Sequence, residues 1–428
     1  MKKKIVMMLL LSMLAGSAAL AGCSSTSTST DTTTTTSTST ADTGSSADTS
    51  GTSSSSSDST ASSSESTATG ETTSYTASDL FSDRDLEQSA DTSSATSYTV
   101  KDGEDITITE EGVYVLSGEA SDVTVTVEAA DDAKVQIVLQ DATITNSDAP
   151  AIYVKSADKV FVTLADGTTN SLSVTGTFTA DGDTNTDAVI FSKSDLTLNG
   201  SGSLSVDSTA NGVSSKDELT ITGGTYTFTC TKDAFEANDS IAVSDGVFNL
   251  TANNGLKAEY DEDDTVGFIY IEGGTFTINA ENDAIHGTTT VQIEGGSFDL
   301  TAVEAIEATQ IEINGGTLKI SASDDGINAT AKSTSLDVSV VISGGDISIE
   351  MGSGDTDAID SNGDLSLTGG TISITANSPF DYVGEGTLDG ATVTVNGEEV
   401  TTLTNQTMGG GGMRGGNGMG RGAGNGRA

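Results

Sequence analysis

The stretch NDAIHGTTTVQIEGGSFDL, residues 282–300, is one copy of a unit that recurs along the middle of the chain. Each copy begins with an acidic residue or Asn, then Ala or Gly, then an apolar residue, at Asp187, Asn211, Asp233, Asn254, Asp283, Glu304, Asp325 and Asp357. Most copies also contain paired glycines followed by alternating apolar residues, at 223–224, 273–274, 295–296, 315–316, 344–345 and 369–370. Repeats of this length indicate a repeat architecture, so they are the first guide to the fold.

The spacing of the copies predicts the fold. Successive starts lie 24, 22, 21, 29, 21, 21 and 32 residues apart. Within a copy the apolar residues alternate with the period of two that is typical of strands. Three short strands in about 21 residues, with no helical segment between them, predict an all-β, right-handed parallel β-helix. Paired glycines fit corners that need positive φ, and the longer spacings predict loops at 259–266, 330–338 and 351–356.

The two ends of the chain differ from this middle part. Residues 1–22 have a basic start and an apolar core ending just before Cys23, which predicts a lipoprotein signal peptide and lipid on Cys23. A plain secretory signal is the alternative. Residues 23–97 are rich in Ser and Thr and predict a disordered stalk; residues 98–405 are the predicted β-helix, and the Gly/Met/Arg-rich residues 406–428 a disordered tail. We therefore expect an extracytoplasmic protein on the bacterial cell surface, held to the lipid bilayer by its acyl anchor.

Charge narrows the choice of partners. The chain has 63 acidic residues against 17 basic ones, and residues 98–405 hold 52 of the acids but only 10 lysines. A negative field of this size repels phosphate, so nucleic acid is excluded as a partner.

Stacked coils would align equivalent residues into ladders about 4.8 Å apart. The repeat starts form one ladder. The residues three positions later form an outward ladder of Glu236, Lys257, His286, Glu307, Asn328 and Asp360. Two carboxylates about 5 Å apart repel by roughly 3 kcal/mol at an effective dielectric of 20, so such a ladder needs protons or cations. Oxygen ligands without clusters of Cys or His favour Ca²⁺, and the acidic insert 259–264 is a second candidate site.

Few residues are suited to catalysis. His286 is the chain's single histidine, but Ile285 precedes it where polygalacturonases have glycine. Pectate lyases use Arg or Lys as the base, and residues 98–405 contain no Arg. Lys257 is the best-placed lysine, yet neighbouring carboxylates favour its charged form. A binding module is therefore favoured; a pectate-lyase-like enzyme with a Lys base and a structural surface adhesin are the alternatives. Cys230 is expected to be a small buried hydrophobic residue.

The Gly-Gly-Thr corners and Asp-Ala-Ile starts, behind the lipobox and the Ser/Thr stalk, resemble a bacterial family of surface carbohydrate-binding β-helix proteins. The resemblance implies a polysaccharide-lyase-like fold, bound Ca²⁺, and binding of cellulose and acidic sugars such as polygalacturonate. By position it implies the Ca²⁺ ligands Asp233, Asp283, Glu304, Asp325 and Asp357, with the outward ladder as the carbohydrate-binding residues. The chain has no Trp, which weakens the case for a flat stacking platform for cellulose.

Overall fold

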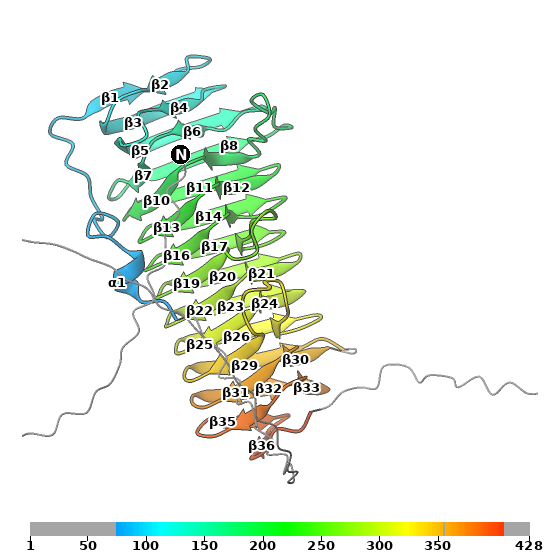
Figure 1. The fold of residues 1–428 in the computed structure, drawn as a ribbon. Helices are drawn as coiled ribbons and strands as arrows, with labels where there is room; N and C mark the ends of the chain where they lie inside the picture. The colour runs from blue at the N-terminus through cyan, green and yellow to red at the C-terminus, as the bar shows by residue number, and fades with distance from the viewer. Residues whose placement is uncertain (1–73, 354–355, 406–428) are drawn as a thin grey trace, which may run out of the picture. The chain divides into compact units, whose positions relative to one another are not determined.

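The computed structural model describes residues 74–353 and 356–405, which consist almost entirely of short β-strands (Figure 1). Their α-helix, α1 (Ala77–Leu80), is a single turn, and none of their helices is long and apolar enough to cross a membrane. The predicted all-β class and the long stacks of parallel strands are confirmed. The signal peptide with Cys23, residues 24–73 of the predicted stalk and the tail 406–428 lie outside the described residues.

The first stack carries both predicted ladders. It is a 12-stranded sheet in which each strand pairs in parallel with the equivalent strand of the next repeat. Its strands, in order, are β2 (Ile106–Ile108), β4 (Val125–Glu128), β6 (Ile152–Ser156), β9 (Ala188–Ser192), β12 (Asn211–Ser215), β15 (Phe235–Ala237), β18 (Leu256–Ala258), β21 (Asp283–Gly287), β24 (Glu304–Ala308), β27 (Ile327–Ala329), β30 (Asp357–Ser361) and β33 (Ser378–Tyr382).

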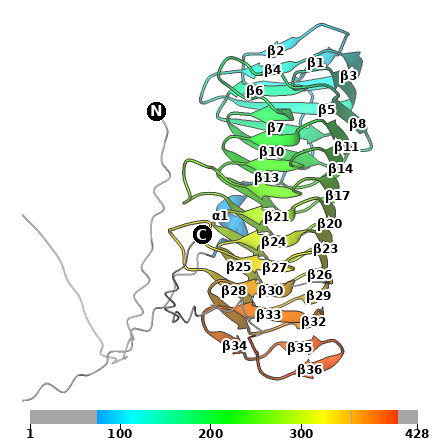
Figure 2. The ribbon, with the colours of Figure 1, turned by 90° about the vertical axis from the view of Figure 1, so that its right-hand side faces the viewer.

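Two further stacks complete the repeats (Figures 1 and 2). The second stack begins at the short strand β1 (Thr96–Thr99), and the long strands β3 (Gly112–Ser121) and β5 (Lys134–Asn146) run through both stacks. The second stack continues with β7 (Lys159–Leu164), β10 (Asp195–Gly200), β13 (Glu218–Ile221), β16 (Ser240–Val243), β19 (Phe268–Ile271), β22 (Thr290–Ile293), β25 (Gln310–Ile313), β28 (Ser339–Ile342), β31 (Asp364–Leu367) and β34 (Gly386–Leu388). The third contains β8 (Thr169–Val174), β11 (Ser203–Ser208), β14 (Thr225–Cys230), β17 (Val247–Ala252), β20 (Thr275–Ala280), β23 (Ser297–Ala302), β26 (Thr317–Ala322), β29 (Asp346–Met351), β32 (Thr371–Thr375) and β35 (Thr392–Val395).

The alternation of apolar residues builds a continuous core between the stacks. Inward residues of the third stack lie directly above one another: the rings of Phe248, Phe276 and Phe298 are parallel within 2°, with centroids 4.5 and 4.7 Å apart. The second glycine of each pair turns the chain into this stack. Gly274 and Gly296 have φ of 112° and 108°, a conformation that side chains other than glycine rarely adopt. The predicted corners are therefore confirmed.

The two ends of the stacks differ. The strands before residue 165, which lack the paired glycines, nevertheless pair in register with the later repeats, as Ile152 does with Ile190. At the other end, β36 (Glu398–Val400) folds back antiparallel on β35, so that Val400 pairs with Val393. This hairpin interrupts the parallel edge, which would otherwise be open for pairing with another chain.

Residues 74–97 differ from the predicted stalk, because they are folded. The segment 75–88, called the strap below, lies across the outward face of the second stack. The Tyr75 ring stacks on Phe268 with centroids 4.0 Å apart, and the Gln292 side-chain amide bonds both the N–H and the C=O of Tyr75, at 2.8 and 2.9 Å. Phe81 packs into a small apolar cluster with Tyr270. The folded part therefore begins about 20 residues before the predicted boundary at 98.

Polar contacts fix the other end of the strap. Asp85 is 2% exposed; its carboxylate accepts hydrogen bonds from Thr197 at 2.6 Å and pairs with the Lys159 ammonium at 2.7 Å. Gln88 binds the backbone N–H of Gly200 and the carbonyl of Thr222. The strap thus connects strands from β7 to β22.

Candidate functional site

The first predicted ladder is present on the first stack. Asp283 pairs in register with Glu304, a step of 21 residues. The Asn254 side chain donates to Asp233 at 2.7 Å and accepts from the backbone N–H of Asp283 at 3.0 Å. At the far end, the backbone N–H of Asp357 donates to Asp325 at 3.1 Å. The repeat starts are therefore neighbours, although their partners differ from coil to coil.

The second predicted ladder is also in register. The pairs Glu236↔Lys257, Lys257↔His286, His286↔Glu307, Glu307↔Asn328 and Asn328↔Asp360 follow one another, and Asp360 pairs with Asp381. Three of these residues, His286, Glu307 and Asn328, are buried and not open to solvent. The predicted carbohydrate-binding ladder is therefore partly covered.

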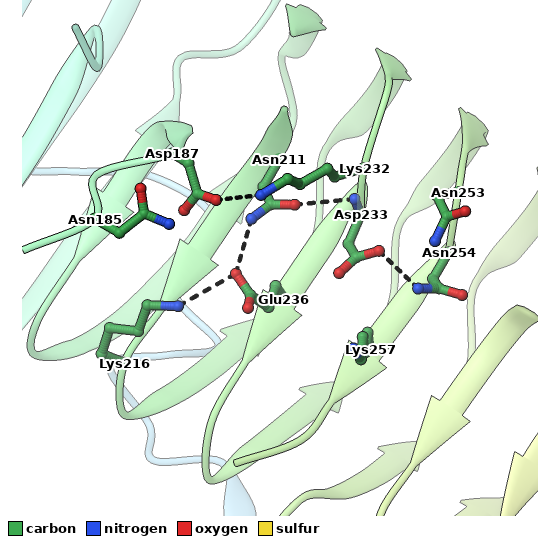
Figure 3. Close-up of a pocket in the computed structure, with 10 residues that line it drawn as sticks. All are labelled: Asn185, Asp187, Asn211, Lys216, Lys232, Asp233, Glu236, Asn253, Asn254 and Lys257. Carbon is green, nitrogen blue, oxygen red and sulfur yellow. Dashed lines mark hydrogen bonds and ion pairs between the residues drawn. The ribbon is translucent and has the colours of Figure 1, made fainter. Parts of the chain in front are cut away.

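The upper part of the two ladders forms a polar cleft of about 360 Å³ (Figure 3). It is lined by Asn185, Asp187, Asn211, Lys216, Lys232, Asp233, Glu236, Asn253, Asn254 and Lys257. Acids in this cleft face built-in cations: Lys232 lies 2.5 Å from Asp187, and Lys216 lies 3.3 Å from Glu236. This end of the ladder needs no added cation to balance these charges.

The middle of the ladders is centred on His286. Its Nδ1 lies 2.8 Å from Asp283 Oδ2 and 2.9 Å from Glu307 Oε2, and these three residues present donor atoms close enough to share a metal ion. Burial opposes the charged imidazolium, but the hydrogen bonds to Asp283 and Glu307 outweigh it and raise the pKa of His286 to about 9. The cluster takes one residue from the predicted metal set and two from the predicted carbohydrate set.

Two inserted loops cover this middle region. Glu259, at the start of the first predicted loop, places Oε1 4.0 Å from His286 Nε2 and pairs with Lys257 at 2.6 Å. Lys332, in the second predicted loop, pairs with Glu307 at 2.9 Å. The two loops are joined where Thr334 donates to Asp264. The two loops explain why His286 is buried although it belongs to the outward ladder.

The lower part of the ladders lacks such cations. Among the described residues no lysine, arginine or histidine forms an ion pair with Glu304, Asp325 or Asp360. Burial and the nearby Glu307 carboxylate raise the pKa of Glu304 to about 7, although Glu304 accepts a hydrogen bond from Asn328. Burial and Asp360 raise the pKa of Asp325 to about 7, and burial and Asp381 raise that of Asp360 to about 6.

An unpaired oxygen lies beside these acids. Asn328 is 8% exposed; its Nδ2 donates to Glu304 at 2.9 Å, while its buried Oδ1 has no hydrogen-bond partner among the described residues. A buried polar atom left unpaired costs about 1–3 kcal/mol. Glu304, Asp325, Asn328 and Asp360, called the acidic cluster below, therefore concentrate oxygen atoms that lack positive partners.

These raised pKa values predict how stability depends on pH. The acids of the acidic cluster hold protons in the folded state that they lose near pH 4 when unfolded. Stability in EDTA should therefore fall as pH rises from 5 to 8, because deprotonation leaves charges that are buried and close to one another only in the folded protein. The His286 ion pairs act in the same direction above pH 6.5, since its folded pKa is the higher one.

Melting temperatures measured in EDTA at pH 5, 6, 7 and 8 test this expectation. Asp325→Asn removes one of the titrating groups and should flatten the slope, whereas Asp299→Asn, an exposed acid on the third stack, should leave it unchanged. A melting temperature that rises across this range would contradict the prediction.

Sequence reasoning missed several partners at the site. Lys332 and Asp381 were not predicted, and Glu259 was noted only as part of an acidic insert. The sequence signal for Lys332 and Glu259 is that they lie in insertions next to a ladder position, and that for Asp381 is its place 21 residues after Asp360. Lys257 was the best-placed candidate base: burial lowers its pKa, but the Glu259 hydrogen bond reverses this and leaves the pKa above its ordinary value. The predicted buried character of Cys230 is confirmed, and burial raises its thiol pKa to about 12.

Known proteins and a protein-family model are similar to parts of this chain. A carbohydrate-binding domain-containing protein of Acetivibrio thermocellus is 35% identical over 126 residues, which are 29% of this chain and 44% of that protein, so the chain spans less than half of its relative's length. The solved structure of the polysaccharide lyase-like protein from C. thermocellum, a gadolinium derivative, aligns with a TM-score of 0.44 and 23% identity over 68% of this chain and 99% of that one. Residues 102–378, well over half of the chain, match the family model described as carbohydrate-binding domain-containing protein, and the chain therefore belongs to this family, as the sequence resemblance predicted.

Proposed function

We propose that the chain is a non-catalytic, surface-anchored module that binds an acidic polysaccharide of the polygalacturonate type through Ca²⁺ held at the acidic cluster. The observation that carries this proposal is that Glu304, Asp325 and Asp360, on three successive repeats around Asn328, have raised pKa values and no ion-pair partner among the described residues. Carboxylate and amide oxygens are the ligands that Ca²⁺ prefers. The donor set therefore fits this ion better than the nitrogen-containing middle of the ladder does.

The chain's own charge explains why a cation is needed. A formal net charge of −46 makes direct contact with a polyuronate unfavourable. Bound Ca²⁺ would supply coordination positions for sugar carboxylates. Asp325 and Asp360 hold the ion at the outer side of the first stack. Asp357, part of the predicted metal set, belongs to the next repeat start and extends the same surface.

The upper cleft supports a second contact with the glycan. Its Asp187 and Glu236 are already paired with lysines, and its amide groups, such as that of Asn253, can donate to sugar hydroxyls. The cleft and the acidic cluster lie on the same stack, so one polymer can reach both, and several weak contacts along a chain raise the overall affinity. We also infer a right-handed winding with about 21 residues per coil, because parallel crossovers are right-handed in nearly all sheets.

Binding to polygalacturonate tests the proposal. We expect the protein to sediment with insoluble polygalacturonate in millimolar Ca²⁺ and to stay in solution in EDTA. Short oligogalacturonates should compete poorly because they engage fewer contacts. Neutral cellulose serves as the comparison polymer, and Asp299→Asn as the control variant. Binding that survives EDTA unchanged, or that prefers cellulose, would leave the acidic cluster as a solvated surface only.

The same samples address catalysis. A lyase product carries an unsaturated uronate that absorbs in the ultraviolet. We expect no rise in absorbance, because Lys257, the candidate base, is held as an ion pair with Glu259. A rise that Lys257→Ala removes without unfolding the protein would favour the lyase alternative.

The proposed anchor lies at Cys23, outside the described residues. We expect the protein made in a bacterial host to partition with membranes, because a diacylated cysteine holds a chain to the bilayer without spanning it. Cys23→Ala should release it into the soluble fraction. Wild-type protein recovered soluble and unacylated would reject the anchor.

A further inference from the structure

His286 occupies an unusual place for an outward ladder position. It lies on β21 between Lys257 and Glu307 of the neighbouring coils, yet only 6% of it is exposed, because the loops that begin near Glu259 and Thr330 cover it. The chain's single imidazole is therefore enclosed among three carboxylates, those of Asp283, Glu307 and Glu259.

The contacts of Nδ1 resemble the spacing of metal ligands. Asp283 Oδ2 and Glu307 Oε2 lie 2.8 and 2.9 Å from this nitrogen. Two ligands at the tetrahedral angles that Zn²⁺ prefers, on bonds of about 2.1 Å, lie about 3.4 Å apart, so each oxygen would move outward by about half an ångström on metal binding. One proton on Nδ1 can satisfy only one of the two carboxylates well, whereas a metal ion that displaces this proton to solvent can bind the nitrogen and both oxygens together.

The other ring nitrogen points to the same conclusion. His286 Nε2 is buried and has no hydrogen-bond partner in the part of the chain that the structure describes, so the second nitrogen of the ring is left unsatisfied there. Glu259 Oε1 stands 4.0 Å away on that side. Metal-ligating histidines commonly donate their second N–H to a carboxylate, and a small shift of Glu259 would complete such a bond. Both sides of the imidazole are thus supplied with acidic groups.

The surrounding charges allow a dication to enter. Asp283 and Glu307 together provide two negative charges. Lys332, which now pairs with Glu307, retains 27% of its side-chain exposure and belongs to a loop, so it can turn toward solvent when a cation takes its place. Asn282 donates to Asp283 at 3.0 Å and holds that carboxylate in position.

We propose that Asp283, His286 and Glu307 form a binding site for a first-row transition-metal dication such as Zn²⁺, separate from the Ca²⁺ site at the acidic cluster. Imidazole is a ligand for Zn²⁺ and Co²⁺, whereas Ca²⁺ takes oxygen ligands. The site joins the coils of β21 and β24 beneath the two loops. It does not depend on the proposed polysaccharide function.

Co²⁺ is the probe, because its visible absorption reports nitrogen and oxygen ligation directly. Protein stripped with EDTA and dialysed should bind one equivalent of Co²⁺ with a new visible band, and Zn²⁺ should remove the band while millimolar Ca²⁺ should not. Calorimetry with Zn²⁺ gives the affinity. His286→Gln should lose the band and weaken Zn²⁺ binding at least 100-fold, and Glu307→Gln at least 10-fold.

Controls separate this site from the acidic cluster and from unfolding. Asp360→Asn should bind Co²⁺ like wild type, and melting curves in EDTA should show each variant folded. Absence of the band in wild-type protein would overturn the proposal. So would a band retained by both His286→Gln and Glu307→Gln, or displacement of Co²⁺ by Ca²⁺.

Discussion

Replacing Asp85 by alanine is expected to lower the free energy of unfolding by about 3 kcal/mol, because it removes one partner of a buried ion pair and leaves the other without its counter-ion. The Asp85 carboxylate is held by Lys159 and Thr197 under the strap, far along the sequence from both. The Lys159 side chain is only 15% exposed, and without Asp85 it loses its ion-pair partner. The strap would also lose the contact that fixes it between its apolar end at Tyr75 and its amide contacts at Gln88.

Chemical unfolding of wild type, Asp85→Ala and Asp83→Ala measures this effect. Asp83 lies two residues away on the same strap but is exposed, so its replacement should change stability by no more than about 0.5 kcal/mol. Limited proteolysis supplies a second readout, since a loosened strap should be cut before the stacked strands are. Equal stability of the two variants would mean that the Asp85 contacts of the strap do not stabilise the fold.

The repeat explains why much of the fold could be predicted. A step of 21 residues from Asp283 to Glu304 is written directly in the sequence, and strand alternation then decides which residues face inward. The same counting predicted that His286 would neighbour Glu307. Paired glycines located the corners, because positive φ restricts the choice of residue there. These features are local or periodic, so pattern reading can find them.

The strap could not be predicted in this way. It has a few more apolar residues than the stalk before it, among them Leu80 and Phe81, but they follow no repeat, and the strap is ordered by contacts with residues more than 70 positions away, such as Asp85 with Lys159. A few apolar side chains are sufficient because the outward face of the second stack presents Phe268 and Tyr270 to receive them. No repeat or period signals such a match between distant surfaces.

The sequence likewise does not show which acids of the ladder have a positively charged partner and which do not. Counting residues aligned Asp283 with Asp325 as equivalent ligands, but Asp283 pairs with His286 while Asp325 has no cation. The difference arises from insertions: Lys332 and Glu259 come from loops of irregular length, whose course the period does not determine. Equivalent positions in a solenoid thus share a place on the stack without sharing an electrostatic environment.

Neutralising the acidic cluster is expected to abolish stabilisation by Ca²⁺. At a hundred times its dissociation constant, Ca²⁺ should stabilise the wild-type fold by about 2.7 kcal/mol per site, or about 4 °C in melting temperature for a folded region of this size. Combined Glu304→Gln, Asp325→Asn and Asp360→Asn substitutions should show no such shift. In EDTA at pH 8 this variant should melt no lower than wild type, because the lost charges repel one another and have no ion-pair partners among the described residues.

The matched control carries the same change in net charge elsewhere. Asp299→Asn, Asp346→Asn and Glu350→Gln are exposed positions on the third stack, and their combined variant should keep the full Ca²⁺ shift. Melting curves of the three proteins in EDTA and in millimolar Ca²⁺ give the comparison. A shift retained by the acidic-cluster variant would place Ca²⁺ elsewhere, and one lost by both variants would show a response to net charge alone. Loss confined to the acidic-cluster variant requires a site built from those residues, since only there do raised pKa values, an unpaired Asn328 oxygen and the absence of a cation partner coincide.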